Sequence, residues 1–112
     1  MAELQDCVKL HYLDLGNNLF REDFQFPNDV LQLTNLKCLY LSYCNIQGAI
    51  PAGIGNLKQL TILQLSDNNM TGEIPTEIGK LANLRNLESD VNGELIWELI
   101  WSWQQQQFVK VL

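Results

Sequence analysis

Residues 72–80, GEIPTEIGK, have the residue types of a phosphate-binding loop, in which glycine amides and a lysine surround a phosphate. Six residues separate the two glycines, where that loop has four, and Leu81 stands where it needs Ser or Thr. The spacing therefore does not predict nucleotide binding. We interpret the stretch as a structural turn.

Other residues that could do chemistry are few. His11 is the single histidine, and it belongs to no recognisable metal-binding or catalytic motif, which predicts a surface residue. The acidic residues at loop and variable positions predict a solvated surface, because a calcium site needs a denser set of ligands. They are Glu22, Asp23, Asp29, Glu73 and Glu77. We therefore expect no enzymatic activity, no bound metal and no cofactor.

The cysteines and one sequence motif bear on processing. Cys7, Cys38 and Cys44 are odd in number and show no CxxC spacing, so neither a complete disulfide framework nor a zinc site is predicted. Asn69-Met70-Thr71 matches the N-glycosylation acceptor motif. It predicts glycosylation at Asn69 if the chain enters the secretory pathway.

Composition limits the classes of function. The chain has 112 residues, of which 46% are hydrophobic, as expected for one globular domain. Its formal net charge of −6 disfavours nucleic acid as a partner. The longest apolar stretch, residues 95–103, contains Glu98 and is shorter than the roughly 20 residues of a membrane span. No signal peptide is recognised, which predicts a cytoplasmic location for the chain as it stands.

A repeat of 24 residues organises the chain. GAIPAGIGNLKQL at 48–60 returns as GEIPTEIGKLANL at 72–84, and the leucines at 39, 63 and 87 keep the same interval. An earlier copy matches at an offset of 26 up to Phe20 and at 24 from Phe26, which indicates a two-residue insertion near 21–23. The predicted units are 10–35, 36–59, 60–83 and a partial unit 84–93, after a flank at 1–9.

Each unit has the pattern of a strand, a turn and a short helical return. Leu39 and Leu41 alternate with Tyr40 and Ser42, as in a strand with one buried face. One residue after each strand is expected to form a ladder that bonds the turning backbone. The predicted ladder residues are Asn18, Cys44, Asn68 and Asn92. The predicted fold is an α/β solenoid of about three and a half repeats, whose units must stack to bury their leucines.

The pattern L-x-x-L-x-L-x-x-N-x-I-x-G-x-I-P-x-x-I-G-x-L resembles the plant-specific leucine-rich repeat. Over residues 4–93 the chain is similar to the ectodomains of plant leucine-rich-repeat receptor-like kinases, including the HAIKU-like branch. The resemblance implies parallel strands on a concave face that engages peptides or co-receptors, and an extracellular or plasma-membrane ancestry. It does not extend to kinase activity, because the 112 residues contain neither an HRD nor a DFG motif.

We expect a non-enzymatic module that binds a protein or peptide on the concave strand face, in signalling or defence in a plant. Tyr12 and Tyr40 are the expected anchors, because tyrosine is enriched at binding hot spots. The predicted contact residues are Tyr12, Asp14, Tyr40, Ser42, Ile62, Gln64, Asn86 and Glu88. The alternative is a truncated receptor-like kinase product without a kinase domain, acting as a decoy or competitor for its parent receptor's partners, or inactive.

The repeat pattern decays after Leu87, and residues 94–112 form a Trp-rich segment. Leu95, Leu99 and Trp103 recur every four residues, which predicts a helical cap over the open end of the solenoid. A membrane-surface role for this segment is disfavoured, since acidic residues outnumber its single base, Lys110. Self-association through the open solenoid ends or this tail is a further expectation.

Overall fold

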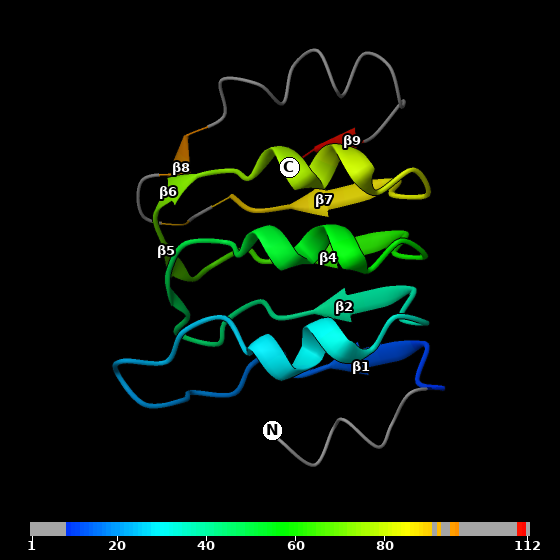
Figure 1. Ribbon diagram of the computed structural model, residues 1–112. Helices are drawn as coiled ribbons and strands as arrows, with labels where there is room; N and C mark the ends of the chain where they lie inside the picture. The colour runs from blue at the N-terminus through cyan, green and yellow to red at the C-terminus, as the bar shows by residue number, and fades with distance from the viewer. Residues whose placement is uncertain (1–8, 91, 93–94, 97–109, 112) are drawn as a thin grey trace.

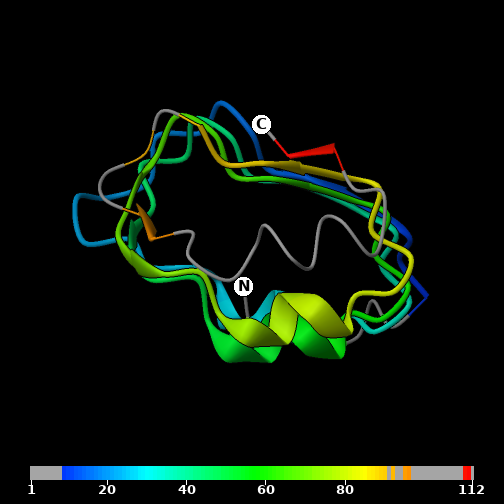
Figure 2. The same cartoon turned by 90° about the horizontal axis from the view of Figure 1, so that it is seen from above.

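A computed structural model describes residues 9–90, 92, 95–96 and 110–111 of the chain. These residues wind into stacked coils with a strand on one side and a 3-10 helix on the other (Figure 1). Seen along the stack, the main sheet forms one long side of the coil and the helices form the opposite side (Figure 2). Residues 1–8 of the expected N-terminal flank lie outside the described part.

The main sheet has five parallel strands in the order in which they occur along the chain. They are β1 (Tyr12–Asp14), β2 (Cys38–Tyr40), β4 (Ile62–Gln64), β7 (Asn86–Glu88) and β9 (Lys110–Val111). Leu39 of β2 is paired with Leu13 before it and Leu63 after it, and Leu63 is paired with Leu87. This register confirms the predicted solenoid of parallel strands, because residues one repeat apart stand side by side.

Two smaller parallel sheets are formed by the segments that come after the main strands, where the chain has turned. One joins β3 (Gln47–Gly48) to β5 (Asn69–Met70), and the other joins β6 (Gly72–Glu73) to β8 (Leu95–Ile96). Gly48 and Gly72 have φ values of +79° and +86°. Glycine is favoured at both positions because a Cβ strains this left-handed backbone, and at Gly48 it would also clash with the side chain of Gln25.

Three short 3-10 helices line the side of the coil opposite the main sheet. They are η2 (Asn28–Gln32), η3 (Ala52–Asn56) and η4 (Thr76–Lys80), preceded by Pro27, Pro51 and Pro75 respectively. Each proline has a φ between −66° and −74°, which suits the start of a helix and needs no backbone donor. The sequence pattern therefore correctly predicted a single loose turn at this place in each repeat.

The stacked coils enclose one continuous apolar core. The repeat leucines at 36, 39, 41, 60, 63, 65, 84 and 87 are fully buried, and Ile54 and Ile78 reach the same core from η3 and η4. The first repeat is less enclosed, since Leu10, Leu13 and Leu15 are partly buried. The extra residues of this repeat form a turn in which the Phe24 amide donates to the Arg21 carbonyl, and Arg21 pairs with Asp23 at 2.8 Å.

The C-terminal segment differs from the helix expected over 94–112. Its four described residues are strand residues: Leu95–Ile96 form β8, and Lys110–Val111 form β9, which pairs with β7 through Asn86↔Lys110 and Leu87↔Val111. The helical prediction is wrong at these four positions, and the rest of the predicted cap lies outside the described residues. Phe108 and Val111 follow Leu84 and Leu87 by 24 residues, a signal of a further strand that the periodicity of four had obscured.

Candidate protein-binding surface

The register of the main sheet arranges its solvent-side residues in two rows, which together we call the sheet face. The first row contains Tyr12, Cys38, Ile62 and Asn86, and the second contains Asp14, Tyr40, Gln64 and Glu88. All of the predicted contact residues except Ser42 lie in these rows. Ser42 follows β2 by two residues and is half-buried. The strands thus bring side chains from four separate repeats onto one surface.

Cys38 is a member of the first row that the sequence analysis did not include. Cys38 is only partly buried and stands between Tyr12 and Ile62 in the register. Its Sγ lies 4.0 Å from the Thr61 hydroxyl oxygen. Cys38 stands one repeat after Tyr12 and one repeat before Ile62, and this spacing could have predicted its place in the row.

Tyr12 and Tyr40 form an aromatic pair across the first two strands. Their ring centroids are 5.1 Å apart and their planes are inclined by 46°. Tyr12 is 57% exposed. The pKa of the Tyr40 hydroxyl is raised, mainly by burial and next by the neighbouring Cys38 thiol. The pair therefore offers a wide, uncharged aromatic contact surface with polar hydroxyl groups.

Charge is divided between the two ends of the strands. Lys37 and Arg85 occupy equivalent, exposed positions just before β2 and β7, and His11 occupies the same position before β1. At the opposite ends are the carboxylates of Asp14, Glu88 and Asp90. The Asp14 carboxylate accepts a bond from the Gly16 amide at 2.8 Å, and the Asp90 carboxylate accepts one from the Ser66 hydroxyl at 2.6 Å. The surface therefore has a basic margin and an acidic margin.

The predicted ladder residues lie one above another beneath the turns. The Asn68 side-chain oxygen accepts bonds from the Cys44 and Ile46 amides, each at 3.0 Å, and its nitrogen donates to the Leu41 and Leu65 carbonyls, each at 2.9 Å. Asn92 repeats this arrangement, accepting from the Met70 amide and donating to the Leu65 and Ser89 carbonyls. Each amide side chain thus joins two consecutive repeats.

Cys44 occupies the weaker rung of this ladder. Its thiol donates to the Leu15 carbonyl at 3.0 Å and accepts from the Asn18 amide. The Phe20 amide donates to the Asn18 carbonyl and not to this thiol. Asn18 is exposed, and its side-chain nitrogen donates to the carbonyls of Leu15 and Gly16 in its own turn. The first turn is therefore held mainly by local bonds.

The remaining candidate sites have structural positions. Gly72 lies in β6 and Thr76–Lys80 form η4, so residues 72–80 are part of a repeat turn. Within the described ranges, no three His, Cys, Asp or Glu side chains are grouped closely enough to hold a metal ion. Asn69 is exposed in β5, and its side-chain nitrogen donates to the Asn45 side-chain oxygen at 3.2 Å. The described part contains no helix long and apolar enough to cross a bilayer.

Comparison with known sequences identifies plant receptors as relatives. The chain is 48% identical over 54 residues to receptor-like protein kinase 7 of Arabidopsis thaliana and 46% identical over 50 residues to receptor-like protein kinase HAIKU2 of the same species. The first alignment covers 48% of this chain and 6% of the relative, and the second covers 45% and 5%. The chain thus corresponds to a small part of these receptors.

Comparison of folds leads to the same class of protein. The plant peptide hormone receptor RGFR1, solved in complex with RGF2, superposes with a TM-score of 0.79 at 40% identity, over 85% of this chain and 15% of the receptor chain. The family model described as a leucine-rich repeat region matches residues 2–112. The protein is therefore similar to plant receptor ectodomains, and it belongs to the leucine-rich repeat family.

Proposed function

We propose that this protein is a non-enzymatic module that binds a protein or an extended peptide on its sheet face. The observation that carries the proposal is the Tyr12–Tyr40 pair, which lies on a surface whose other side is the leucine core. Tyrosine supplies a large contact area at a low entropic cost, which is why it is frequent at binding hot spots. RGFR1, whose fold is similar, was solved with RGF2 bound, which supports a peptide or protein as partner.

The composition of the sheet face suggests the chemistry of the partner. An aromatic pair is flanked by Asp14 and lies between the basic margin of Lys37 and the acidic margin of Glu88. A partner that crosses the strands would place its basic groups toward the strand ends and its acidic groups toward the strand starts. Such charge complementarity mainly fixes orientation and raises the rate of association.

A second candidate function is competition with a longer receptor. The 48% identity to receptor-like protein kinase 7 extends over 54 residues, whereas the chain covers 6% of that protein. A short array with a receptor-like sheet face would bind part of the same partner, and these 112 residues contain neither an HRD nor a DFG motif that could pass on a signal. Addition of the purified chain to cells that carry the receptor would then reduce signalling, and an unchanged response would exclude competition.

The primary proposal is tested by affinity capture followed by direct measurement. The full chain and its Tyr40→Ala variant are immobilised, proteins retained from native plant tissue are identified, and their binding is measured with purified components. We expect the variant to bind about 30-fold more weakly, as for a hot-spot residue that contributes about 2 kcal/mol. The control is Lys58→Ala, which changes an exposed residue outside the sheet face. Equal affinity of Tyr40→Ala and the unaltered protein would place the site elsewhere.

Self-association stays a prediction. It rests on the solenoid ends and on residues 94–112, most of which lie outside the described residues. Sedimentation of the full chain over a wide range of concentrations would test it, and a monomer at every concentration would exclude it.

A further inference from the structure

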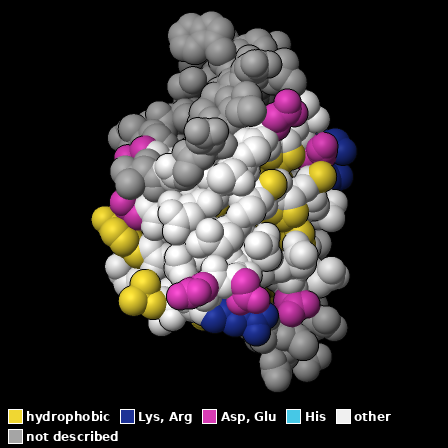
Figure 3. Space-filling view, turned by 90° about the vertical axis from the view of Figure 1, so that its left-hand side faces the viewer, with side chains coloured by type: hydrophobic (Ala, Val, Ile, Leu, Met, Phe, Trp, Pro, Cys, Tyr) yellow, Lys and Arg dark blue, Asp and Glu magenta, His cyan; other side chains and the backbone are white. Residues whose placement is uncertain are grey.

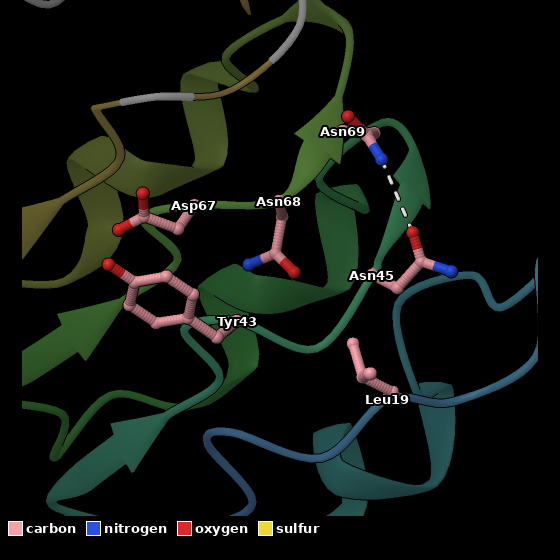
Figure 4. A pocket seen from close by; sticks show the side chains of 6 residues that line it. All are labelled: Leu19, Tyr43, Asn45, Asp67, Asn68 and Asn69. Carbon is pink, nitrogen blue, oxygen red and sulfur yellow. Dashed lines mark hydrogen bonds between the residues drawn. The ribbon is translucent and has the colours of Figure 1, made fainter.

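An open hollow of about 340 Å³ lies beyond the carboxyl ends of β1, β2 and β4, outside the two rows of the sheet face. It is lined by Leu19, Tyr43, Asn45, Asp67, Asn68 and Asn69. Figure 4 shows the Tyr43 hydroxyl directed toward the Asp67 carboxylate, while Asn45 and Asn69 face each other. On this side of the molecule, hydrophobic and acidic side chains lie next to each other along the left-hand margin (Figure 3).

The backbone at Tyr43 is in a conformation that seldom carries an aromatic residue. Its φ is +58°, close to +61° at Asn17 and +59° at Asp67, the equivalent positions of the neighbouring repeats. All three amides donate to a carbonyl of the next repeat: Asn17 to Ser42, Tyr43 to Ser66 and Asp67 to Asp90. The stacking of the repeats therefore imposes the left-handed conformation.

Asparagine and aspartate tolerate this conformation, whereas a bulky residue is strained in it. The choice of tyrosine at position 43 is thus not explained by the backbone, which would be better served by the residue types at 17 and 67. Strained residues are concentrated at functional sites, where the surrounding structure holds them in place. Tyr43 is also 54% exposed, so its ring adds little to the core.

The groups around Tyr43 are suited to a cation. The pKa of the Tyr43 hydroxyl is raised, first by the charge of the Asp67 carboxylate and then by the hydrogen bond between them, with a smaller effect of Asp90. Within the described part of the chain, no Lys or Arg forms an ion pair with Asp67. The ion pair in that part of the chain joins Arg21 to Asp23, away from the hollow's lining residues. Leu19 adds an apolar wall that is 89% exposed.

We propose that this hollow binds an arginine or lysine side chain of a partner polypeptide. The cationic group would lie against the Tyr43 ring and pair with the Asp67 carboxylate, and the aliphatic stem would contact Leu19. A cation over an aromatic ring and a charge-assisted hydrogen bond are both attractive, and the carboxylate supplies complementary charge. The site adds a second contact surface to the protein and does not rest on binding at the sheet face.

The test uses the full chain labelled with ¹⁵N and a probe of defined chemistry. Acetyl-Gly-Arg-Leu-Gly-amide is titrated at low ionic strength, and its counterpart with citrulline, which has the shape of arginine without the charge, is titrated in parallel. We expect the amide resonances of Leu19, Tyr43 and Asp67 to shift with the arginine peptide and to stay unshifted with the citrulline peptide. Equal shifts with both peptides would overturn the proposal.

Two variants separate binding from folding. Tyr43→Asn and Asp67→Asn both place at the left-handed position a residue type that tolerates it. We expect both to abolish the shifts, and we expect Tyr43→Asn to melt at the same or a higher temperature because it relieves the strain. A lower melting temperature together with retained shifts would show that Tyr43 is structural, which would overturn the proposal.

A third variant separates this site from the proposed function. Tyr12→Ser changes the sheet face and is expected to leave the shifts at Tyr43 and Asp67 intact. Shifts confined to β1 and β2 would mean that the peptide binds at the sheet face and not in the hollow. That result would overturn the present proposal but not the proposed function. Shifts that depend on protein concentration without any peptide would mean that a second copy of the chain occupies the hollow, which would also overturn the proposal.

Discussion

The side-chain oxygen of Asn68 accepts a hydrogen bond of 3.0 Å from the backbone amide of Cys44, one repeat earlier in the stack. Both residues are buried, so neither partner of this bond can turn to water instead. The same Asn68 side chain also bonds to the backbone of residues 41, 46, 65 and 66. One amide thus replaces water for the buried turns of two repeats.

Replacement of Asn68 by alanine is therefore expected to destabilise the protein strongly. Each buried backbone group left without a partner costs about 1–3 kcal/mol, so the loss of these bonds should lower the free energy of unfolding by at least about 3 kcal/mol. Urea denaturation followed by circular dichroism measures the change. The control is Asn83→Ala, whose exposed side chain donates one bond of 3.3 Å to the Lys58 carbonyl and should matter by less than about 0.5 kcal/mol. Equal effects of the two substitutions would contradict the ladder.

Cys44 is expected to make stability depend on alkaline pH. Burial raises the pKa of its thiol above the ordinary value, which outweighs the opposing effect of the Asn18 amide. Because the folded pKa exceeds the unfolded pKa, the contribution is fully present below the unfolded value of about 8.5 and is lost as the pH rises through the folded value.

The measurement is the urea midpoint of the protein and of Cys44→Ala between neutral and strongly alkaline pH. The variant starts from a lower stability but should lose less of it as the pH rises. Tyr40 and Tyr43 also have raised pKa values and lose their own contributions above about pH 10, in both proteins alike. Parallel pH curves for the two proteins would show that the Cys44 thiol does not titrate differently on unfolding.

Leu63 is predicted to be essential for the core. Its side chain is fully buried at the centre of the stack, paired with Leu39 and Leu87 in the register. Leu63→Ala should lower the free energy of unfolding by about 2–5 kcal/mol, a large part of the roughly 5–15 kcal/mol available to a small domain. Leu19→Ala is the matched control, since Leu19 is 89% exposed and the change should stay within about 0.5 kcal/mol. Thermal denaturation of both variants measures the two changes, and equal effects would contradict the burial of Leu63.

The pairing of β9 with β7 predicts a structural role for the end of the chain. Truncation after Gly93 removes β8 and β9, and should lower the unfolding midpoint because β6 and β7 lose their partners. Val111→Asp should have the same direction of effect, since Val111 is aligned in the register with the core residue Leu87, whereas Lys110→Gln, at the position aligned with Asn86, should not. A truncated protein with an unchanged midpoint and unchanged amide exchange in β7 would contradict this role.

The sequence alone was sufficient to predict the repeated unit and its buried face. Apolar residues at a fixed interval of 24, in alternation along each strand, have one arrangement that buries all of them, and the structure shows Leu39, Leu63 and Leu87 side by side in that arrangement. Gly48 and Gly72 occur at the same place in the 24-residue repeat, and the structure shows there a left-handed backbone that favours glycine. Seven of the eight predicted contact residues lie in the two rows that this register forms, and Ser42 does not.

The tertiary structure decided which exposed residues act together. Cys38 joins the sheet face and Ser66 is buried against Asp90, although both residue types are compatible with either environment. Leu19, Tyr43 and Asp67 come from three different repeats, and no local pattern indicates that they line one hollow. At the C-terminus, the apolar spacing of four suggested a helix, but Leu95–Ile96 and Lys110–Val111 are strands. Stacking on β6 and β7 overrides local helical preference there, because an open sheet edge gains hydrogen bonds from an added strand that a helix cannot supply.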